Sequence, residues 1–318
     1  MQKRRLGNSE IEIAPLAFGG NVFGWTVEEA TSFKLLDAFV EAGFSFIDTA
    51  DMYSRWAAGN RGGESETIIG KWLQRGGRRD RVHIATKVGS EMGPGRKGLS
   101  GNYITRAVED SLGRLQTDYI DLYQSHVDDD QTPLEETLNA YDQLIKAGKV
   151  RVIGASNYTA ERLQAALDTS RQQGVPRYQS LQPLYNLCDR EEFETALAPL
   201  CREQQVGVIS YFSLASGFLT GKYRSTEDLA GRARGGMVEK YLDERGLRIL
   251  AALDKVAHSH RLTPATVALA WLIAQPAVTA PIASATSMDQ LQELIRATAV
   301  ELDAASMDLL NEASAFDR

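Results

Sequence analysis

The chain has 318 residues, of which 43% are hydrophobic and 24% are charged, and its formal net charge is −7. These values are typical of one large α/β enzyme domain, so we expect residues 1–318 to form a single domain. The acidic balance argues against nucleic acid or an anionic membrane surface as the main partner.

The sequence gives little indication of a membrane-spanning helix, a signal peptide or a metal site. No apolar stretch approaches the roughly 18–20 residues that a membrane-spanning helix needs. The basic start, Met1 to Arg5, leads into polar residues, so we expect no signal peptide. Cys188 and Cys201 have neither CxxC spacing nor a histidine nearby, which predicts free thiols and no metal site. We therefore expect a cytoplasmic protein without a membrane partner.

Short apolar runs alternate with longer amphipathic segments along the chain. The first predicted elements are a hairpin over 3–13 with its turn at Gly7 and Asn8, a strand at 15–18 and a helix at 28–42. Five strand–helix pairs follow, at 44–48 with 64–75, 82–87 with 102–115, 119–124 with 133–147, 150–154 with 159–172, and 178–182 with 189–204. The remaining elements are a strand at 206–211, a Gly-rich loop to about 241, helices at 243–260 and 264–274, a strand at 278–282, and helices at 287–297 and 302–315.

Eight strand–helix units without a domain-breaking linker predict an α/β fold of the (β/α)8 TIM barrel type, with an N-terminal β-hairpin and extra C-terminal helices. A doubly wound open sheet is the alternative, and it requires a Gly-rich phosphate turn leading directly into a helix. The segment from Gly19 to Gly24 does not fit that pattern, because no helix begins there. The pattern therefore favours the barrel.

Three predicted strand ends carry side chains that can take part in a reaction, namely Asp48, Lys87 and His126. A tyrosine, Tyr53, follows the first of these strand ends. Barrel enzymes keep their active sites at the carboxyl ends of the strands. Lys87 beside Tyr53 would lower the pKa of the tyrosine hydroxyl and make it a proton donor to a carbonyl oxygen. Asp48 would hold Lys87, and neutral His126 would orient the carbonyl. Together they predict a carbonyl reductase.

The whole chain resembles the aldo-keto reductase superfamily, above all the bacterial branch that also contains potassium-channel β-subunits. Phe46-Ile-Asp-Thr-Ala-Asp-Met-Tyr53 resembles the family's first signature, and Ile84-Ala-Thr-Lys-Val88 resembles its lysine motif. Asp118-Tyr-Ile-Asp-Leu-Tyr-Gln-Ser-His126 is similar to the segment that carries its histidine. The resemblance implies a (β/α)8 barrel, Tyr53 as proton donor and a nicotinamide cofactor bound without a Rossmann domain.

The resemblance also implies cofactor contacts in the second half. Ser156, Asn157 and Gln182 resemble the residues that hold the nicotinamide carboxamide, and Tyr211 resembles the aromatic that stacks on the ring. The following loop would bring backbone amides and cations to the pyrophosphate. The predicted cofactor-binding residues are Gly20, Asn21, Val22, Asp48, Ser156, Asn157, Gln182, Tyr211, Phe212, Ser213, Leu214, Ala215, Gly217, Lys222, Arg232 (or Arg234), Ser284, Thr286, Gln290 and Glu293.

The segment 284–294 departs from the family pattern. Ser284 replaces a glycine, and Leu294 replaces an asparagine. Thr286 takes the place of an Arg or Ser that contacts the 2′-phosphate of NADPH in relatives, and it keeps a hydroxyl donor without the charge. We therefore expect NADP(H) as the cofactor and leave NAD(H) open.

Aromatic residues after the first two strands predict the substrate pocket. We expect Phe23, Trp25, Trp56 and His126 to surround the reacting carbonyl, with packing under the barrel rim as the alternative for the aromatic residues. The expected activity is reversible, NADP(H)-dependent reduction of aldehydes or ketones to alcohols. The substrate would be a small-molecule carbonyl or alcohol, and an oligomer stays open.

Two rival functions fit parts of the sequence. A cofactor-binding regulatory subunit would bind NADPH with little turnover. A barrel isomerase or aldolase would use Lys87 as a Schiff-base lysine. That second rival leaves Tyr53 and the amide-binding residues without a role.

Overall fold

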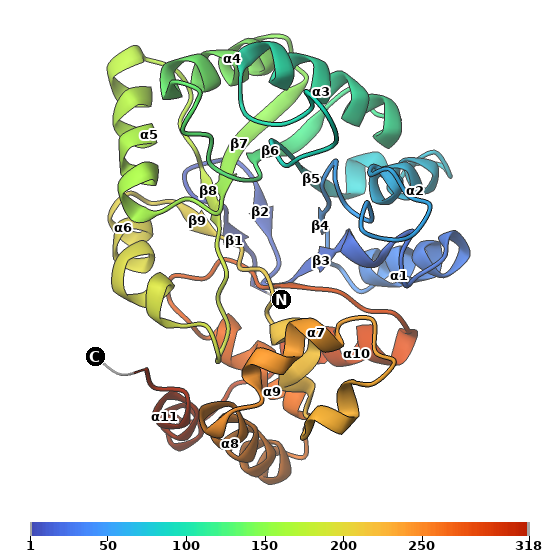
Figure 1. Cartoon of the computed structure of the whole chain (residues 1–318), viewed down its shortest axis with the longest axis vertical. Helices are drawn as coiled ribbons and strands as arrows, with labels where there is room; N and C mark the ends of the chain where they lie inside the picture. The colour runs from blue at the N-terminus through green and yellow to red at the C-terminus, as the bar shows by residue number, and fades with distance from the viewer. Residues whose placement is uncertain (1, 317–318) are drawn as a thin grey trace.

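Eight parallel strands form the centre of the computed structural model, which describes residues 2–316 (Figure 1). Their order is β10-β3-β4-β5-β6-β7-β8-β9, so neighbours follow the chain except at the last strand. The strands are β3 (Ala17–Gly19), β4 (Phe46–Asp48), β5 (His83–Val88), β6 (Ile120–Ser125), β7 (Val150–Ser156), β8 (Ser180–Gln182), β9 (Gly207–Val208) and β10 (Ile282–Ala283).

The last strand segment joins the two ends of this sheet. The backbone N–H groups of Thr279 and Ile282 donate to the carbonyl oxygens of Val208 and Ser210, each at 2.8 Å, while β10 pairs with β3 on its other side. With helices in the connections, this arrangement confirms the predicted (β/α)8 fold.

The N-terminal hairpin is also confirmed. β1 (Arg4–Arg5) and β2 (Glu12–Ile13) pair antiparallel. Leu6 and Ile13 are fully buried and pack with inward-facing strand residues such as Phe46 and Leu122. The hairpin therefore contributes its apolar side chains to the interior of the barrel.

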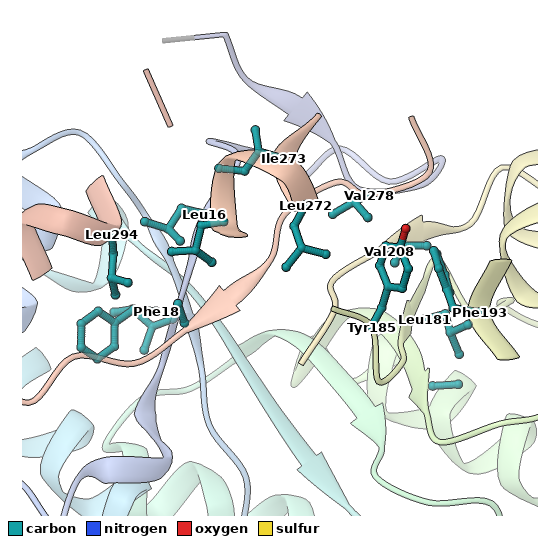
Figure 2. Close-up of a cluster of buried hydrophobic side chains, with 14 of the residues drawn as sticks. Leu16, Phe18, Leu181, Tyr185, Phe193, Val208, Leu272, Ile273, Val278 and Leu294 are labelled. Atoms are coloured by element: carbon teal, nitrogen blue, oxygen red, sulfur yellow. The ribbon is translucent and has the colours of Figure 1, made fainter. Parts of the chain in front are cut away.

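The helices lie outside the strands, and α7 to α11 gather along one side (Figure 1). Figure 2 shows part of the core between the strands and these helices, where Phe18 lies near Leu294. The helices are α1 (Glu29–Glu41), α2 (Glu64–Leu73), α3 (Gly101–Leu115), α4 (Leu134–Lys146), α5 (Ala160–Gln173), α6 (Ala198–Glu203), α7 (Gly235–Val238), α8 (Glu244–His260), α9 (Pro264–Ile273), α10 (Met288–Ala297) and α11 (Ala304–Ala313).

Three predicted elements differ from the structure. The strand expected at 278–282 begins only at its last residue, since β10 covers Ile282–Ala283 and the preceding Pro281 has no backbone N–H to donate. The helix expected over 189–204 contains a π-helical turn, Phe193–Leu197, before α6 begins. Pro199 has no backbone N–H to donate, which explains a shift of the hydrogen-bond ladder at this point. The loop expected up to residue 241 contains short helical turns, including η4 (Ala215–Thr220) and α7.

Close packing of α2 on α3 gives a test of the fold. A Cβ at Gly70 would lie 2.1 Å from the carbonyl oxygen of Arg114, whereas a Cβ at Gly113 would meet nothing within 4 Å. Gly70→Ala is expected to lower the free energy of unfolding by about 2–3 kcal/mol through overpacking. Gly113→Ala should raise it by about 0.5–1 kcal/mol, the usual gain in a helix. Urea unfolding of both variants checks the difference, and equal effects would contradict the packing described.

Candidate functional site

Asp48, Tyr53 and Lys87 lie in hydrogen-bond contact at the carboxyl ends of β4 and β5. The Nζ of Lys87 donates to Asp48 Oδ2 at 2.8 Å, to Tyr53 Oη at 2.8 Å and to the carbonyl oxygen of Thr49 at 2.7 Å. An ammonium has three donors, so all three are used. Tyr53 Oη in turn donates to Asp48 Oδ2 at 3.2 Å.

Strand register explains this contact. Asp48 pairs with Ala85 across β4 and β5, and Lys87 is two residues further along its strand. Because side chains alternate along a strand, Lys87 points to the same face as Ala85, one layer closer to the barrel mouth. Lys87 is fully buried, and Asp48 is 1% exposed.

Burial sets the protonation of Tyr53. Burial first and the Asp48 carboxylate second raise the pKa of Tyr53 well above its usual range. This direction is opposite to the lowered pKa expected from the sequence, because burial and the Asp48 carboxylate both disfavour the phenolate. Burial also lowers the pKa of Lys87, and the attraction of Asp48 opposes that shift. The tyrosine hydroxyl is thus fully protonated at neutral pH.

His126 follows the end of β6 and lines the same cavity as Tyr53. The two rings meet edge to face with their centroids 6.0 Å apart. Burial, and then the Lys87 charge, hold the pKa of His126 well below its usual value. Among residues 2–316, His126 Nδ1 has no hydrogen-bond partner. The neutral imidazole predicted from the sequence matches this direction.

A cavity of about 670 Å³ opens over these residues, within the size range of ligand-binding clefts. It is lined by Tyr53 and His126 and also by residues of α10, so it extends beyond the barrel mouth. The predicted site residues that line it are Asn21, Val22, Asp48, Tyr53, Trp56, His126, Ser156, Asn157, Gln182, Tyr211, Phe212, Ser213, Leu214, Gly217, Lys222, Arg232, Ser284, Thr286, Gln290 and Glu293.

Four predicted site residues are not among those that line the cavity, namely Phe23, Trp25, Gly20 and Ala215. Phe23 is fully buried and stacks on Phe18 with ring centroids 5.4 Å apart, so its predicted place beside the substrate is wrong. Trp25 meets Trp56 edge to face at 5.6 Å and supports the exposed Trp56 from behind. Gly20 and Ala215 are buried as well.

The residues predicted to bind the nicotinamide carboxamide lie together beside Asp48, Tyr53 and Lys87. Tyr211 Oη donates to Asn157 Oδ1 at 2.7 Å, and Asn157 Nδ2 donates to the carbonyl oxygen of His126 at 2.9 Å. Gln182 Nε2 donates to Asp48 Oδ1 at 2.8 Å, and Ser156 Oγ donates to the Gln182 carbonyl oxygen at 2.8 Å. These bonds fix the amide side chains at the edge of the cavity.

The segment after Tyr211 has a strained backbone. Phe212, Ala215 and Ser216 have φ values of 52°, 47° and 57°, and Gly217 has 101°. Non-glycine residues in the left-handed region are costly and gather at functional sites. A Cβ at Gly217 would lie 3.6 Å from Lys222 Nζ, so the ammonium lies beside this turn. A turn of this kind with an adjacent cation is suited to a phosphate group.

The segment 284–294 forms another part of the wall. Ser284 Oγ donates to Asn21 Oδ1 at 2.7 Å, and a Cβ at Gly19 would lie 2.5 Å from that hydroxyl. Gly19 therefore makes room for the serine that replaces the family's glycine. The N–H and Oγ1 of Thr286 donate to Gln290 Oε1 at 2.8 and 3.0 Å. Leu294, noted as a departure from the family, lines the cavity as an apolar residue.

Sequence reasoning missed several wall residues, because they lie outside the recognised motifs, some in loops and others in β3, β10 and α9. They are Gly19, Thr26, Met52, Ser216, Thr220, Tyr223, Ala233, Ala265, Ile282 and Ala283.

Sequence reasoning also missed two further acidic residues near Lys87, Asp51 and Glu66. Asp51 is 2% exposed, and neither of its carboxyl oxygens has a hydrogen-bond partner within residues 2–316. Glu66 accepts from Thr86 Oγ1 at 2.5 Å and from Arg114 Nε at 2.6 Å. Burial and then Glu66 raise the pKa of Asp51 to about 8. The only sign of Asp51 in the sequence was its position, three residues after Asp48.

Asp51 should make stability depend on pH. The folded chain keeps a proton on Asp51 that the unfolded chain releases above its ordinary pKa of 3.8, so stability falls as pH rises from there to about 8. Asp51→Asn has a similar shape and does not ionise. The free energy of unfolding of this variant, relative to that of the wild type, should grow by up to about 1.4 kcal/mol for each pH unit across that window. Urea unfolding at several pH values checks this, and a constant difference would contradict it.

Residues 2–316 lack two further kinds of feature. No helix there is long and apolar enough to span a membrane. No group of three or more His, Cys, Asp or Glu side chains in that range is placed to hold a metal ion.

Comparison with known proteins adds independent information. Residues 15–315 match the family model "Aldo/keto reductase family". Protein tas from Escherichia coli is 35% identical over 99% of this chain and 97% of its own length. Aldo-keto reductase yakc of Schizosaccharomyces pombe, whose name specifies NADP(+), is 31% identical over 98% of this chain and 90% of its own. A probable voltage-gated potassium channel subunit beta of Arabidopsis thaliana is 31% identical over 94% and 92%. The chain belongs to the aldo/keto reductase family.

Proposed function

We propose that this chain is an NADP(H)-dependent oxidoreductase that reduces aldehydes or ketones to alcohols and catalyses the reverse reaction. The observation that carries the proposal is the triple donation of Lys87 Nζ to Asp48, Tyr53 and Thr49 beside a large cavity. We further propose that residues 1–318 act as one domain and that the protein works in the cytoplasm.

Tyr53 is the proposed proton donor. Its protonated hydroxyl faces the cavity, and it would give its proton to the carbonyl oxygen as that oxygen gains negative charge. Lys87 donates to the same phenol oxygen, so the phenolate that forms is stabilised at once. Asp48 keeps the lysine charged and in place. His126 would donate to the carbonyl oxygen and orient it.

The cavity residues fit a nicotinamide dinucleotide. When bound, this cofactor supplies the hydride for the carbonyl carbon. Asn157 and Gln182 would hold its carboxamide, and Tyr211 would cover the ring. The left-handed turn near Gly217 and the Lys222 ammonium would hold its phosphates. Leu294 and Ala265 provide an apolar surface for the adenine.

The preference for NADP(H) rests on the cations of this wall. Thr286 offers no charge, and its hydroxyl already donates to Gln290. Lys222 and Arg232 line the cavity and would compensate a 2′-phosphate. The NADP(+) in the name of the S. pombe relative supports the same choice.

A regulatory subunit is the second candidate, because a relative is named as a potassium channel subunit. That role needs cofactor binding without efficient turnover. The assembled triad of Asp48, Tyr53 and Lys87 favours turnover instead.

Fluorescence titration with NADPH and NADH, followed by a panel of aldehydes and ketones in the same cuvette, tests this proposal. We expect tighter binding of NADPH and carbonyl-dependent loss of the reduced cofactor. Tight binding without turnover on any carbonyl would favour the regulatory role. Equal binding of both cofactors would contradict the NADP(H) preference alone.

A further inference from the structure

Arg234, the alternative to Arg232 in the sequence-based set of cofactor residues, is a charged cavity residue to which the proposed reductase chemistry gives no role. It lines the cavity, and burial lowers the pKa of its guanidinium. Its guanidinium forms no hydrogen bond or ion pair with any residue in the range 2–316, and its close partner is the Trp25 ring, 5.4 Å from the guanidinium carbon. Arg234 is half-buried, and a guanidinium partly removed from water without an anionic partner is costly, so this position is suited to an anion supplied by a ligand.

A series of aromatic contacts connects Arg234 with the catalytic part of the cavity. Arg234 stacks on Trp25, Trp25 meets Trp56 edge to face at 5.6 Å, and Trp56 meets Tyr53 edge to face at 6.1 Å. The guanidinium therefore lies on the same wall as the proposed proton donor. Trp56 is 46% exposed, which leaves this wall open to a substrate.

Other groups are placed for the cofactor phosphates. The Lys222 ammonium lies beside the left-handed turn at Gly217. Arg232 is exposed and lines the cavity as well. The acidic cavity residues are Asp48, which is paired with Lys87, and Glu293 of α10. The cavity wall therefore carries more unpaired cationic side chains than unpaired acidic ones.

We propose that Arg234 binds an anionic group, a carboxylate or a phosphate ester, carried by the carbonyl substrate away from its reacting carbon. This inference rests on the proposed reductase function and narrows its substrate class to anionic aldehydes and ketones. Arg234 is then a specificity-determining residue, because its fork of donors matches a carboxylate or phosphate and its face packs on Trp25.

Matched substrate pairs test the proposal. Succinic semialdehyde is compared with its methyl ester, and glyceraldehyde phosphate with glyceraldehyde, using the wild type, Arg234→Met and Arg234→Lys. The wild type should favour the charged member of at least one pair by about 30-fold or more in kcat/KM, the scale of a lost buried charge contact. The pair that shows the preference distinguishes carboxylate from phosphate. Arg234→Met should remove it, and Arg234→Lys should retain part of it.

Cofactor affinity and folding are measured in parallel. Arg234→Met should keep the Kd for NADPH within about twofold and melt like the wild type, as expected for a cavity residue that binds substrate alone. The matched control Lys222→Met should weaken NADPH binding while keeping the preference between paired substrates. A binding readout without turnover is the quenching of tryptophan fluorescence when succinate is added to the NADP(+)-loaded wild type, which Arg234→Met should lose.

Three results would overturn the proposal. Equal use of charged and uncharged members by the wild type would refute the anion site and leave the reductase function standing. Weaker NADPH binding by Arg234→Met, with the substrate preference intact, would assign the guanidinium to a cofactor phosphate. Reduction of neither member of either pair would count against the reductase function and the anion site together.

Discussion

Tyr53→Phe is expected to lower kcat for carbonyl reduction by about a thousandfold or more, while the Kd for NADPH stays within about threefold. The change removes one oxygen, the atom that accepts from Lys87 at 2.8 Å and donates to Asp48 at 3.2 Å. The ring keeps its position against Trp56 and His126, so the cavity wall is preserved.

The matched control is Tyr123→Phe. The Tyr123 hydroxyl is buried and has no hydrogen-bond partner within the described residues, so its removal should leave kcat within about twofold. Steady-state kinetics and fluorescence titration provide both measurements. A Tyr53→Phe protein that keeps more than about a tenth of the wild-type kcat would remove Tyr53 from the role of acid.

Lys87→Met should have the largest combined effect on activity and stability. It leaves the Asp48 carboxylate, 1% exposed, without its counter-ion. Breaking a buried ion pair at one side costs about 3–5 kcal/mol of stability. Loss of the donor to the Tyr53 oxygen should lower kcat by at least about a hundredfold.

Urea unfolding of the double variant Asp48→Asn/Lys87→Met separates the two effects. The unpaired charge is gone in that protein, so most of the stability should return while activity stays absent. Lys71→Met is the surface control, because its partner Glu29 is half exposed, and it should change stability by less than about 1 kcal/mol. A Lys87→Met protein as stable as the wild type would contradict the buried ion pair.

The barrel was predictable from the sequence because it depends on local patterns. Apolar strands and amphipathic helices recur with the period of the fold, glycines follow three of the helices at Gly43, Gly148 and Gly174, and most elements lie within a few residues of the expected bounds. Asp48 and Lys87 were found for the same reason, since both lie at strand ends.

Features that depend on burial were not predictable in this way. Phe23 lies only a few residues from Asn21 in the same loop, yet it turns into the core while Asn21 lines the cavity. The raised pKa of Tyr53 follows from burial of its side chain beside the Asp48 carboxylate, which spacing does not reveal. Asp51 is buried without a hydrogen-bond partner for its carboxyl oxygens within the described residues, and Arg234 is half-buried beside the Trp25 ring, both through the paths of their loops.

Transfer of deuterium from NADPH labelled at C4 of the nicotinamide to a carbonyl substrate tests the central claim most directly. We predict that the wild type yields an alcohol with one deuterium on the former carbonyl carbon, detected by mass spectrometry, and that Tyr53→Phe yields almost none. An alcohol formed without the label, or no alcohol from any aldehyde or ketone despite tight NADPH binding, would contradict the proposed reductase.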